Sequence, residues 1–315
     1  MRAIWDGGVQ AVLIVMPIFI LIGMGWVLKY KGLLMPSTLK ENNFILYWFT
    51  MPAMLFRGIL RADINVLQNP LFLVAVWSPY LITLLLVWSG RRWEIPSRFA
   101  VLSLSATRGN HFFAGLPIVS LAMGSGGVEA ATLILAFSLV IMQLVSIGSG
   151  QLAFFGTLSW RSLKDTALQL LKNPLFVTCL FGLLLIFADL NHLPEWLDET
   201  LAILADISTG LALLMLGAEL HVENILKMVT SVRKIALFKL VVHPIITYLI
   251  FTSLGLSREM TQAGVLLAAM PVGVNTAIIA QAMGMDSEYC SRGIAVSTLC
   301  SIVSLPLWIG LLGLA

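Results

Sequence analysis

The sequence contains long runs without a charged residue, and these runs constrain its fold more than any other feature. They cover residues 7–28, 64–90, 130–160, 260–285 and 293–315. Crossing the roughly 30 Å hydrocarbon core of a bilayer takes about 20 helical residues, so each run is long enough to span a membrane. Of the 315 residues, 59% are hydrophobic and 11% are charged, whereas about a quarter of a soluble domain is charged. The sequence therefore predicts an all-α integral membrane protein.

Shorter, interrupted apolar stretches raise the expected number of spans to ten. Splitting the chain at its loop signals places the helices at 9–29, 42–60, 70–90, 99–123, 128–150, 174–190, 198–219, 236–256, 260–284 and 289–312. Cytoplasmic loops of membrane proteins are enriched in lysine and arginine. Loops after odd-numbered helices hold thirteen basic residues, and the N-terminus with the other loops holds three. We therefore expect an integral protein of the inner cell membrane with both termini outside, in the periplasm.

Two pairs of similar segments indicate an internal repeat of five helices. A constant offset of 157 relates Pro17, Phe19 and Gly25 to Pro174, Phe176 and Gly182. An offset of 160 relates LAMG at 121–124 to QAMG at 281–284. Because five is odd, the second copy crosses the membrane upside down, which is the plan of many secondary transporters. The sequence thus predicts a first inverted repeat at 1–150, a short cytoplasmic linker at 151–173 and a second repeat at 174–315.

The fourth and ninth helices are each interrupted near the middle. The predicted helix breaks are Gly109, Gly115, Pro117, Pro271 and Gly273. Counted from opposite membrane faces at 1.5 Å per residue, Asn110 lies roughly 18 Å deep and Pro271 lies at a similar depth. We therefore expect the broken helices to cross at the midplane. Backbone groups freed there must line a cavity or be buried in protein, and half-helix N-termini favour an anion.

Polar residues near the breaks are the candidate substrate-binding groups. They are Arg108, Asn110, His111, Gln143, Asn275 and Thr276. Arg108 is expected about 15 Å deep, where its guanidinium suits two-pronged binding of a carboxylate. An ion pair with Asp206 and snorkelling toward the cytoplasm are the alternatives. His111 and Asp206 are candidate proton-coupling groups, and a core histidine and a water-facing carboxylate are the alternatives.

Three further ionisable residues receive structural interpretations. We expect Lys239 and Arg57 to lie near helix ends and to reach toward the membrane surface. His243 precedes Pro244 and is expected to stabilise a kink.

A family resemblance rests on four segments. It is strongest in 110-NHFFAGLP-117 and 269-AMPVGVNTAIIAQAMGMDSEYCSRGIAVSTLCSIVSLPLW-308, and it extends to 51-MPAMLF-56 and 239-KLVVHPIITYL-249. These segments resemble the auxin efflux carrier family, which includes plant PIN-type exporters and shorter bacterial organic-acid carriers. The resemblance covers the whole chain and implies a bile-acid-symporter-like fold. It also implies a scaffold of helices 1, 2, 6 and 7 that forms a homodimer, and a moving transport domain of helices 3–5 and 8–10.

The sequence departs from the family pattern at the expected site. His111 and Phe112 stand where the family usually has Thr-Gly, and an arginine at position 108 is unusual. Gln143 stands where an asparagine is common, and the usual proline near Gly210 is lacking. Because these changes fall at the site, the resemblance does not make auxin the expected substrate.

The broken helices and the resemblance together predict a transporter rather than an enzyme. We expect alternating access with a small organic anion bound at the crossing, either a carboxylate such as malonate or malate or an auxin-like aromatic acid. The main alternative is a sodium-coupled organic-anion symporter of the bile-acid type. No acidic residue lies within ten positions of Asn110 or Pro271, which disfavours that alternative. Proton or sodium coupling stays open, and a channel and an intramembrane enzyme are weaker alternatives. No cofactor, metal site or nucleic-acid partner is expected; the expected partners are the anion, membrane lipid and a second copy of the chain.

Overall fold

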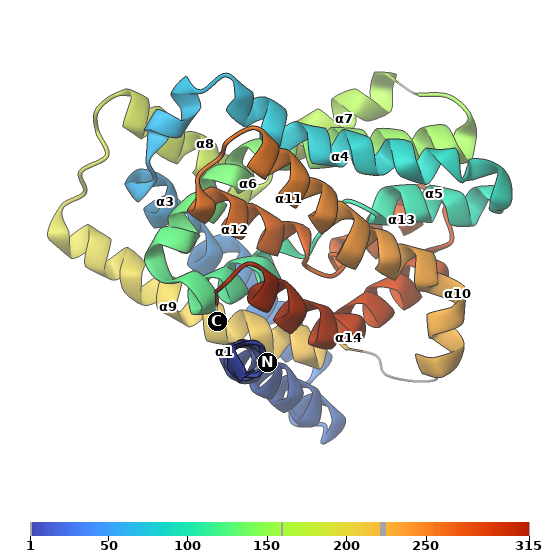
Figure 1. Cartoon of the computed structure of the whole chain (residues 1–315), viewed down its shortest axis with the longest axis horizontal. Helices are drawn as coiled ribbons and strands as arrows, with labels where there is room; N and C mark the ends of the chain where they lie inside the picture. Colours follow the sequence, from blue (N-terminus) through green and yellow to red (C-terminus); the bar gives the residue numbers. More distant parts are fainter. Residues whose placement is uncertain (1, 159, 221–224, 315) are drawn as a thin grey trace.

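The computed structural model describes residues 2–158, 160–220 and 225–314, except for the side chains of residues 2–12, 14, 15, 93, 160–163 and 225–227. Regular secondary structure within these ranges is helical (Figure 1). The first half contains α1 (Arg2–Tyr30), α2 (Pro36–Ile45), the π-turn η1 (Leu46–Thr50), α3 (Met51–Arg61), η2 (Ile64–Gln68), α4 (Leu71–Ser89), η3 (Arg91–Trp93), α5 (Pro96–Ser105), the π-turn η4 (His111–Gly115) and α6 (Leu116–Phe155). The second half contains α7 (Trp160–Leu171), α8 (Pro174–Phe187), α9 (Glu195–Ala218), α10 (Ile225–Leu237), the π-turn η5 (Phe238–Val242), α11 (His243–Ser253), α12 (Arg258–Ala268), α13 (Asn275–Ala282) and α14 (Ser287–Leu311).

The length and composition of these helices agree with an all-helical membrane protein. Among the described residues, five helical stretches are long and apolar enough to cross a membrane: Leu71–Ser89, His111–Phe155, Glu195–Ala218, Met228–Ser253 and Ser287–Leu311. The bent pair of α7 and α8 adds a sixth if the two helices are counted as one span. Helix is present in each of the ten predicted ranges, but several of these helices are short or interrupted. Ten complete spans therefore stay a prediction.

Gly124 divides α6 into two arms. Its φ of 69° lies in the left-handed region, which glycine adopts without strain. The sequence predicts one helix ending at residue 123 and the next starting at 128, and Gly124 lies at this junction. The continuous assignment of α6 therefore contains the end of the fourth predicted helix and all of the fifth.

The predicted linker at 151–173 is more structured than a loop. The helix α6 continues to Phe155, and α7 occupies most of the remainder before a 69° bend leads into α8. Asn173 then caps α8, since its side-chain oxygen accepts a hydrogen bond from the N–H of Leu175 at 2.9 Å. Among the basic residues that orient the predicted spans, Arg2, Arg161 and Lys227 have side chains outside the described ones.

Two groups of helices pack closely, and they also contact each other where α1 meets α14 and where α3 meets α6. In the first, α9 packs against α1 and α3, and α3 also packs against α8. A Cβ on Gly25 of α1 would overlap the carbonyl of Leu214, and a Cβ on Gly217 of α9 would overlap the carbonyl of Ile22. Small residues allow membrane helices to approach this closely. In the second group, α4, α5 and α12 pack on α6, α11 packs on α4 and α12, and α10 and α13 pack on α14.

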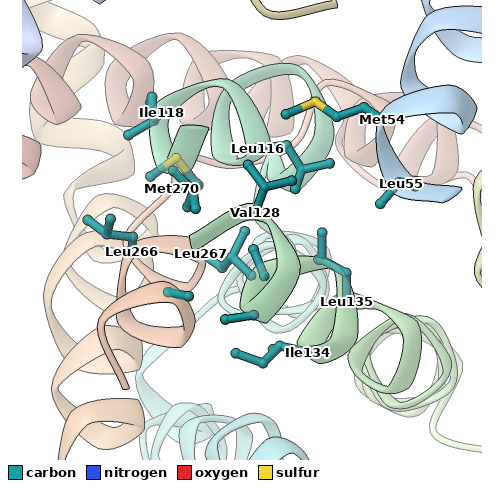
Figure 2. Close-up of a cluster of buried hydrophobic side chains, with 14 of the residues drawn as sticks. Met54, Leu55, Leu116, Ile118, Val128, Ile134, Leu135, Leu266, Leu267 and Met270 are labelled. Atoms are coloured by element: carbon teal, nitrogen blue, oxygen red, sulfur yellow. The ribbon is translucent and has the colours of Figure 1, made fainter. Parts of the chain in front are cut away.

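An apolar core joins α3, both arms of α6 and the end of α12 (Figure 2). Its labelled members are Met54, Leu55, Leu116, Ile118, Val128, Ile134, Leu135, Leu266, Leu267 and Met270. Each of these side chains is at most 8% exposed. The core therefore holds the end of α12 against α6 beside the segment where α12 stops.

Candidate functional site

Two non-helical segments pair at the positions where the sequence predicts broken helices. One joins α5 to η4 at residues 106–110, and the other joins α12 to α13 at residues 269–274. The N–H of Asn110 donates to the carbonyl of Pro271 at 2.8 Å, and the N–H of Gly273 donates to the carbonyl of Arg108 at 3.0 Å. The resulting antiparallel bridge satisfies backbone groups that the breaks release from helical bonding.

The crossing leaves little room for side chains at its two central glycines. A Cβ on Gly273 would lie 3.1 Å from the carbonyl oxygen of Gly109, and a Cβ on Gly109 would lie 2.5 Å from Nε2 of His111. The prediction that Gly115 and Pro117 break the helix is wrong, because both residues lie in helical turns after the break. The N–H of Gly115 bonds to the carbonyl of Asn110 at 2.9 Å in the π-turn η4. This wider turn lets the helix continue through Pro117, which has no N–H to donate.

A cavity of about 70 Å³ lies against the paired segments. This is several times the space that one water needs. Its lining brings together all the predicted substrate-binding residues, namely Arg108, Asn110, His111, Gln143, Asn275 and Thr276. The helix that starts at His111 and the helix α13 both begin at this lining. Their first N–H groups and their dipoles favour negative charge in the cavity.

Arg108 is a buried cation in this lining and is 5% exposed. Its Nη1 donates to Oε1 of Gln143, and to Oγ of Ser146 at 3.1 Å. These uncharged partners orient the guanidinium without neutralising it. The alternative of an ion pair with Asp206 is wrong, because Asp206 is exposed on α9 and lines a different cavity. The two candidate coupling residues, His111 and Asp206, therefore lie at separate places.

Several buried polar atoms at the cavity have no hydrogen-bond partner among the described residues. They are Nε of Arg108, both ring nitrogens of His111 and Oγ1 of Thr276. Buried polar groups are almost always bonded, and an unsatisfied one costs about 1–3 kcal/mol. An oxygen-rich ligand can accept from Nε of Arg108, from Oγ1 of Thr276 and from the protonated ring nitrogen of His111, whereas the unprotonated ring nitrogen of His111 needs a donor.

Lys239 is a second buried cation, and the expectation that it reaches the membrane surface is wrong. Its side chain is 0% exposed, and its Nζ donates to the carbonyl of Ala268. The predicted helix start at residue 236 misplaces it, because α10 begins at Ile225 and continues into η5. Fourteen helical residues thus precede Lys239, which corresponds to about 21 Å of helix. Lys239 and His111 lie beside the same glycine, because a Cβ on Gly109 would meet Cε of Lys239 at 3.2 Å and Nε2 of His111 at 2.5 Å.

The charges at the crossing are unbalanced. Buried side chains among the described residues include Arg108 and Lys239 but no aspartate or glutamate. The cavity lining also contains no carboxylate. A buried charge without a partner costs several kcal/mol. A bound anion would supply the missing negative charge.

A second cavity of about 260 Å³ lies between α3, the kink of α6 and α9. Arg57 lines it and does not simply reach toward the surface as the sequence analysis expects. Instead, its Nε and Nη2 donate to the carboxylate of Asp198 at 2.9 Å and 3.1 Å. Arg61 lies 2.7 Å from the same carboxylate. Since Glu129 and Asp206 also line this cavity, its mixed charges give no preference for an anion.

Three residues of the crossing region were missed by the sequence analysis. Tyr47 of η1 and Asn173 before α8 line the cavity, and nothing in their local sequence marks them. Lys239 had a usable signal, since a lysine in an apolar stretch is functional by default. His243 bonds to α4, since its Nδ1 lies 2.9 Å from Oγ1 of Thr83 and its ring packs on Tyr80, and its expected role at a kink stays a prediction.

Comparison with known proteins relates the chain to transporters. Residues 157–309 match the family described as "Membrane transport protein". An "Uncharacterized transporter" of Methanothermobacter thermautotrophicus is 24% identical over 310 residues, which cover 93% of this chain and 96% of the relative. A protein of Rhizobium meliloti named "Putative malonate transporter" is 25% identical over 275 residues, which cover 84% of this chain and 83% of the relative.

Proposed function

We propose that this chain, which is related to membrane transport proteins, is a secondary transporter for small organic anions in the auxin efflux carrier family. The observation that carries the proposal is the unbalanced positive charge at the crossing of the two broken helices. Arg108 and Lys239 are buried there without a buried carboxylate among the described residues. Moving a carboxylate into hydrocarbon costs of order 20 kcal/mol in the Born limit. A prepositioned cation and two helix N-termini offset that cost for a small anion.

Two features favour a short dicarboxylate over an aromatic acid. The cavity of about 70 Å³ is small compared with the roughly 300–1,000 Å³ of drug-sized ligand sites. Its unpaired polar atoms come from Arg108, His111 and Thr276, so both ends of a short dicarboxylate would find partners. One relative is named as a malonate transporter. Malonate is therefore the first substrate to test, and malate and succinate follow.

The proposed mechanism is alternating access. Helices α1, α2, α3, α8 and α9 would form the static scaffold and contact a second copy of the chain. Helices α4 to α6 and α10 to α14 would move with the bound anion. The packing of the two helix groups supports this division, and each half ends in the same order of helix, break, helix and long helix. This order supports ten spans in two inverted repeats, and the basic residues of the loops support placing both termini in the periplasm.

Counterflow in proteoliposomes tests the proposal. Vesicles preloaded with unlabelled malonate should accumulate labelled malonate above its equilibrium level, and the uptake should saturate. The variant Arg108→Ala should abolish the accumulation, whereas Arg98→Ala on the exposed face of α5 should retain it. A channel would let label equilibrate without accumulation. Absence of counterflow with every dicarboxylate would overturn the proposal.

A further inference from the structure

Lys239 lies at the C-terminal end of a broken helix, which is a kind of position that secondary transporters use to bind a coupling cation. Broken helices expose the carbonyls of their C-terminal turns, which form the negative ends of the helix dipoles. In secondary transporters these half-helix ends often coordinate sodium or a proton. Here the helix α12 ends at Ala268, and the Nζ of Lys239 donates to the carbonyl of that residue.

The hydrogen-bonding pattern of the break leaves that carbonyl open for a cation. In a continuous helix, the carbonyl of Ala268 would accept from the N–H of Val272. In this structure the N–H of Val272 instead donates to Oγ of Ser297 at 3.1 Å. Lys239 therefore fills a position that the broken backbone creates. The fit is tight, since a Cβ on Gly109 would lie 3.2 Å from Cε of Lys239.

The lysine does not belong to an ion pair among the described residues. The ion pairs among these residues join Asp198 to Arg57 and Arg61, Glu94 to Lys234, and Glu288 to Arg292. Its polar surroundings include the end of α12, where it bonds to the carbonyl of Ala268, and His111, which lies beside the same glycine, Gly109. No group of His, Cys, Asp or Glu side chains that could hold a metal ion is present among the described residues, so a free cation here would rely on backbone oxygens such as the carbonyl of Ala268.

We propose that the ammonium group of Lys239 is a tethered cation that replaces a coupling sodium ion at the C-terminal end of α12. The lysine neutralises the helix end and adds positive charge behind the anion site on every cycle, without being transported. The inference rests on the proposed function, because it assigns the role of the coupling ion in that carrier. It requires that anion transport is independent of sodium in the wild type.

Removing the lysine should open a cation site. Purified wild type, Lys239→Ala, Lys239→Met and Lys239→Arg would be compared in sodium chloride, choline chloride and ethylammonium chloride. Lys234→Ala is the matched control, because Lys234 lies on the same helical stretch but is 41% exposed. The first readout is the thermal unfolding temperature without substrate. The second is malonate affinity in the same salts.

Sodium or ethylammonium should stabilise only Lys239→Ala relative to choline, since that variant alone has both the open carbonyl and the space. Its malonate affinity in choline should fall about tenfold or more and recover with either cation. Lys239→Met should lose affinity without recovery, because its side chain fills the space, and Lys239→Arg should keep part of the affinity. Wild type and Lys234→Ala should respond to none of the salts.

Two results would overturn the inference. One is a sodium-dependent unfolding temperature or affinity in the wild type. The other is a Lys239→Ala protein that folds, ignores cations and binds malonate as the wild type does. If Lys239→Ala does not fold, full malonate affinity in Lys239→Met overturns the inference as well. Failure of every variant to bind an anion would instead overturn the proposed function, while the stability readout would still test the cation site.

Discussion

At the scale of single residues, the hydrogen-bond partner of each arginine decides whether its charge is balanced. Arg57 and Arg108 both lie inside predicted spans, but Arg57 is paired with Asp198 and Arg108 is held only by neutral side chains. The charge of Arg57 is therefore already balanced, and the charge of Arg108 is available to a ligand. This difference supports the proposed role of Arg108 in substrate binding and a structural role for Arg57.

We expect Arg108 to lower the stability of the substrate-free protein, or to leave it unchanged, relative to an uncharged side chain. Replacing it by methionine of similar length removes a buried charge that lacks a counter-charge, so the free energy of unfolding should stay equal or rise by up to about 4 kcal/mol. Unfolding of substrate-free protein in detergent measures this. The matched control is Arg57→Met, which leaves Asp198 with less compensation and should not stabilise. A loss of several kcal/mol in Arg108→Met would show that Arg108 is a structural residue.

The sequence alone predicts those candidate site residues that lie at or beside the two helix breaks. Arg108, Asn110 and Thr276 are predictable because glycine or proline beside a polar residue in an apolar run requires a cavity. The contact of Lys239 with Ala268 is not predictable in this way, since it depends on how two distant helices pack. Lys239 was expected near the membrane surface because the predicted helix started at residue 236. The segment before residue 236 is amphipathic, so its sequence does not indicate a membrane span.

At the scale of elements, the crossing is held by backbone bonds and by the absence of side chains at its glycines. Each break supplies one donor and one acceptor to the other. The N–H of Asn110 donates to the carbonyl of Pro271, and the N–H of Gly273 donates to the carbonyl of Arg108. These bonds hold the two breaks against each other, which suits the proposed substrate site because its geometry must be kept.

Gly109→Ala should disturb this geometry with limited loss of folding. The added methyl group would meet Nε2 of His111 and Cε of Lys239, so both side chains must shift. Malonate affinity should fall by about tenfold to a hundredfold, as expected for groups displaced by about 1 Å. Isothermal titration measures this, with Gly210→Ala as a control at a glycine with open space. Unchanged affinity in Gly109→Ala would show that the crossing tolerates a side chain and does not position the ligand.

The contact between α1 and α9 also depends on glycine. Gly217→Ala would force the two backbones apart and should cost about 1–3 kcal/mol of stability. Gly210→Ala on the same helix has nothing within 4 Å of its new Cβ and should be neutral or stabilising by up to about 1 kcal/mol. Chemical unfolding of both variants measures the difference. Equal stability of the two would contradict the tight packing of this scaffold.

At the scale of the whole molecule, composition predicts an integral membrane protein made of helices. Long uncharged runs span a bilayer as helices, because a helix bonds all its backbone polar groups internally. The helix ranges follow from the same runs. Orientation rests on the basic residues of the loops alone, since packing does not reveal which face meets the cytoplasm.

Cysteine labelling in intact cells tests that orientation. Cys179, Cys290 and Cys300 are first replaced, and single cysteines are placed at exposed Lys31 and Gln68. A membrane-impermeant maleimide applied to spheroplasts should label Gln68→Cys directly and Lys31→Cys only after permeabilisation. The reverse pattern would place the termini in the cytoplasm.

The most direct test of the central claim is a binding measurement on purified protein. Malonate, malate, succinate and indole-3-acetate would be titrated into wild type, Arg108→Met and the exposed-arginine control Arg98→Met, with sodium absent. We predict saturable binding of a short dicarboxylate to the wild type and to Arg98→Met, and a loss of about a hundredfold or more in Arg108→Met, as expected when a buried charged partner is removed. Equal binding by Arg108→Met and the wild type would contradict the claim that the positive crossing of the two broken helices is the anion site.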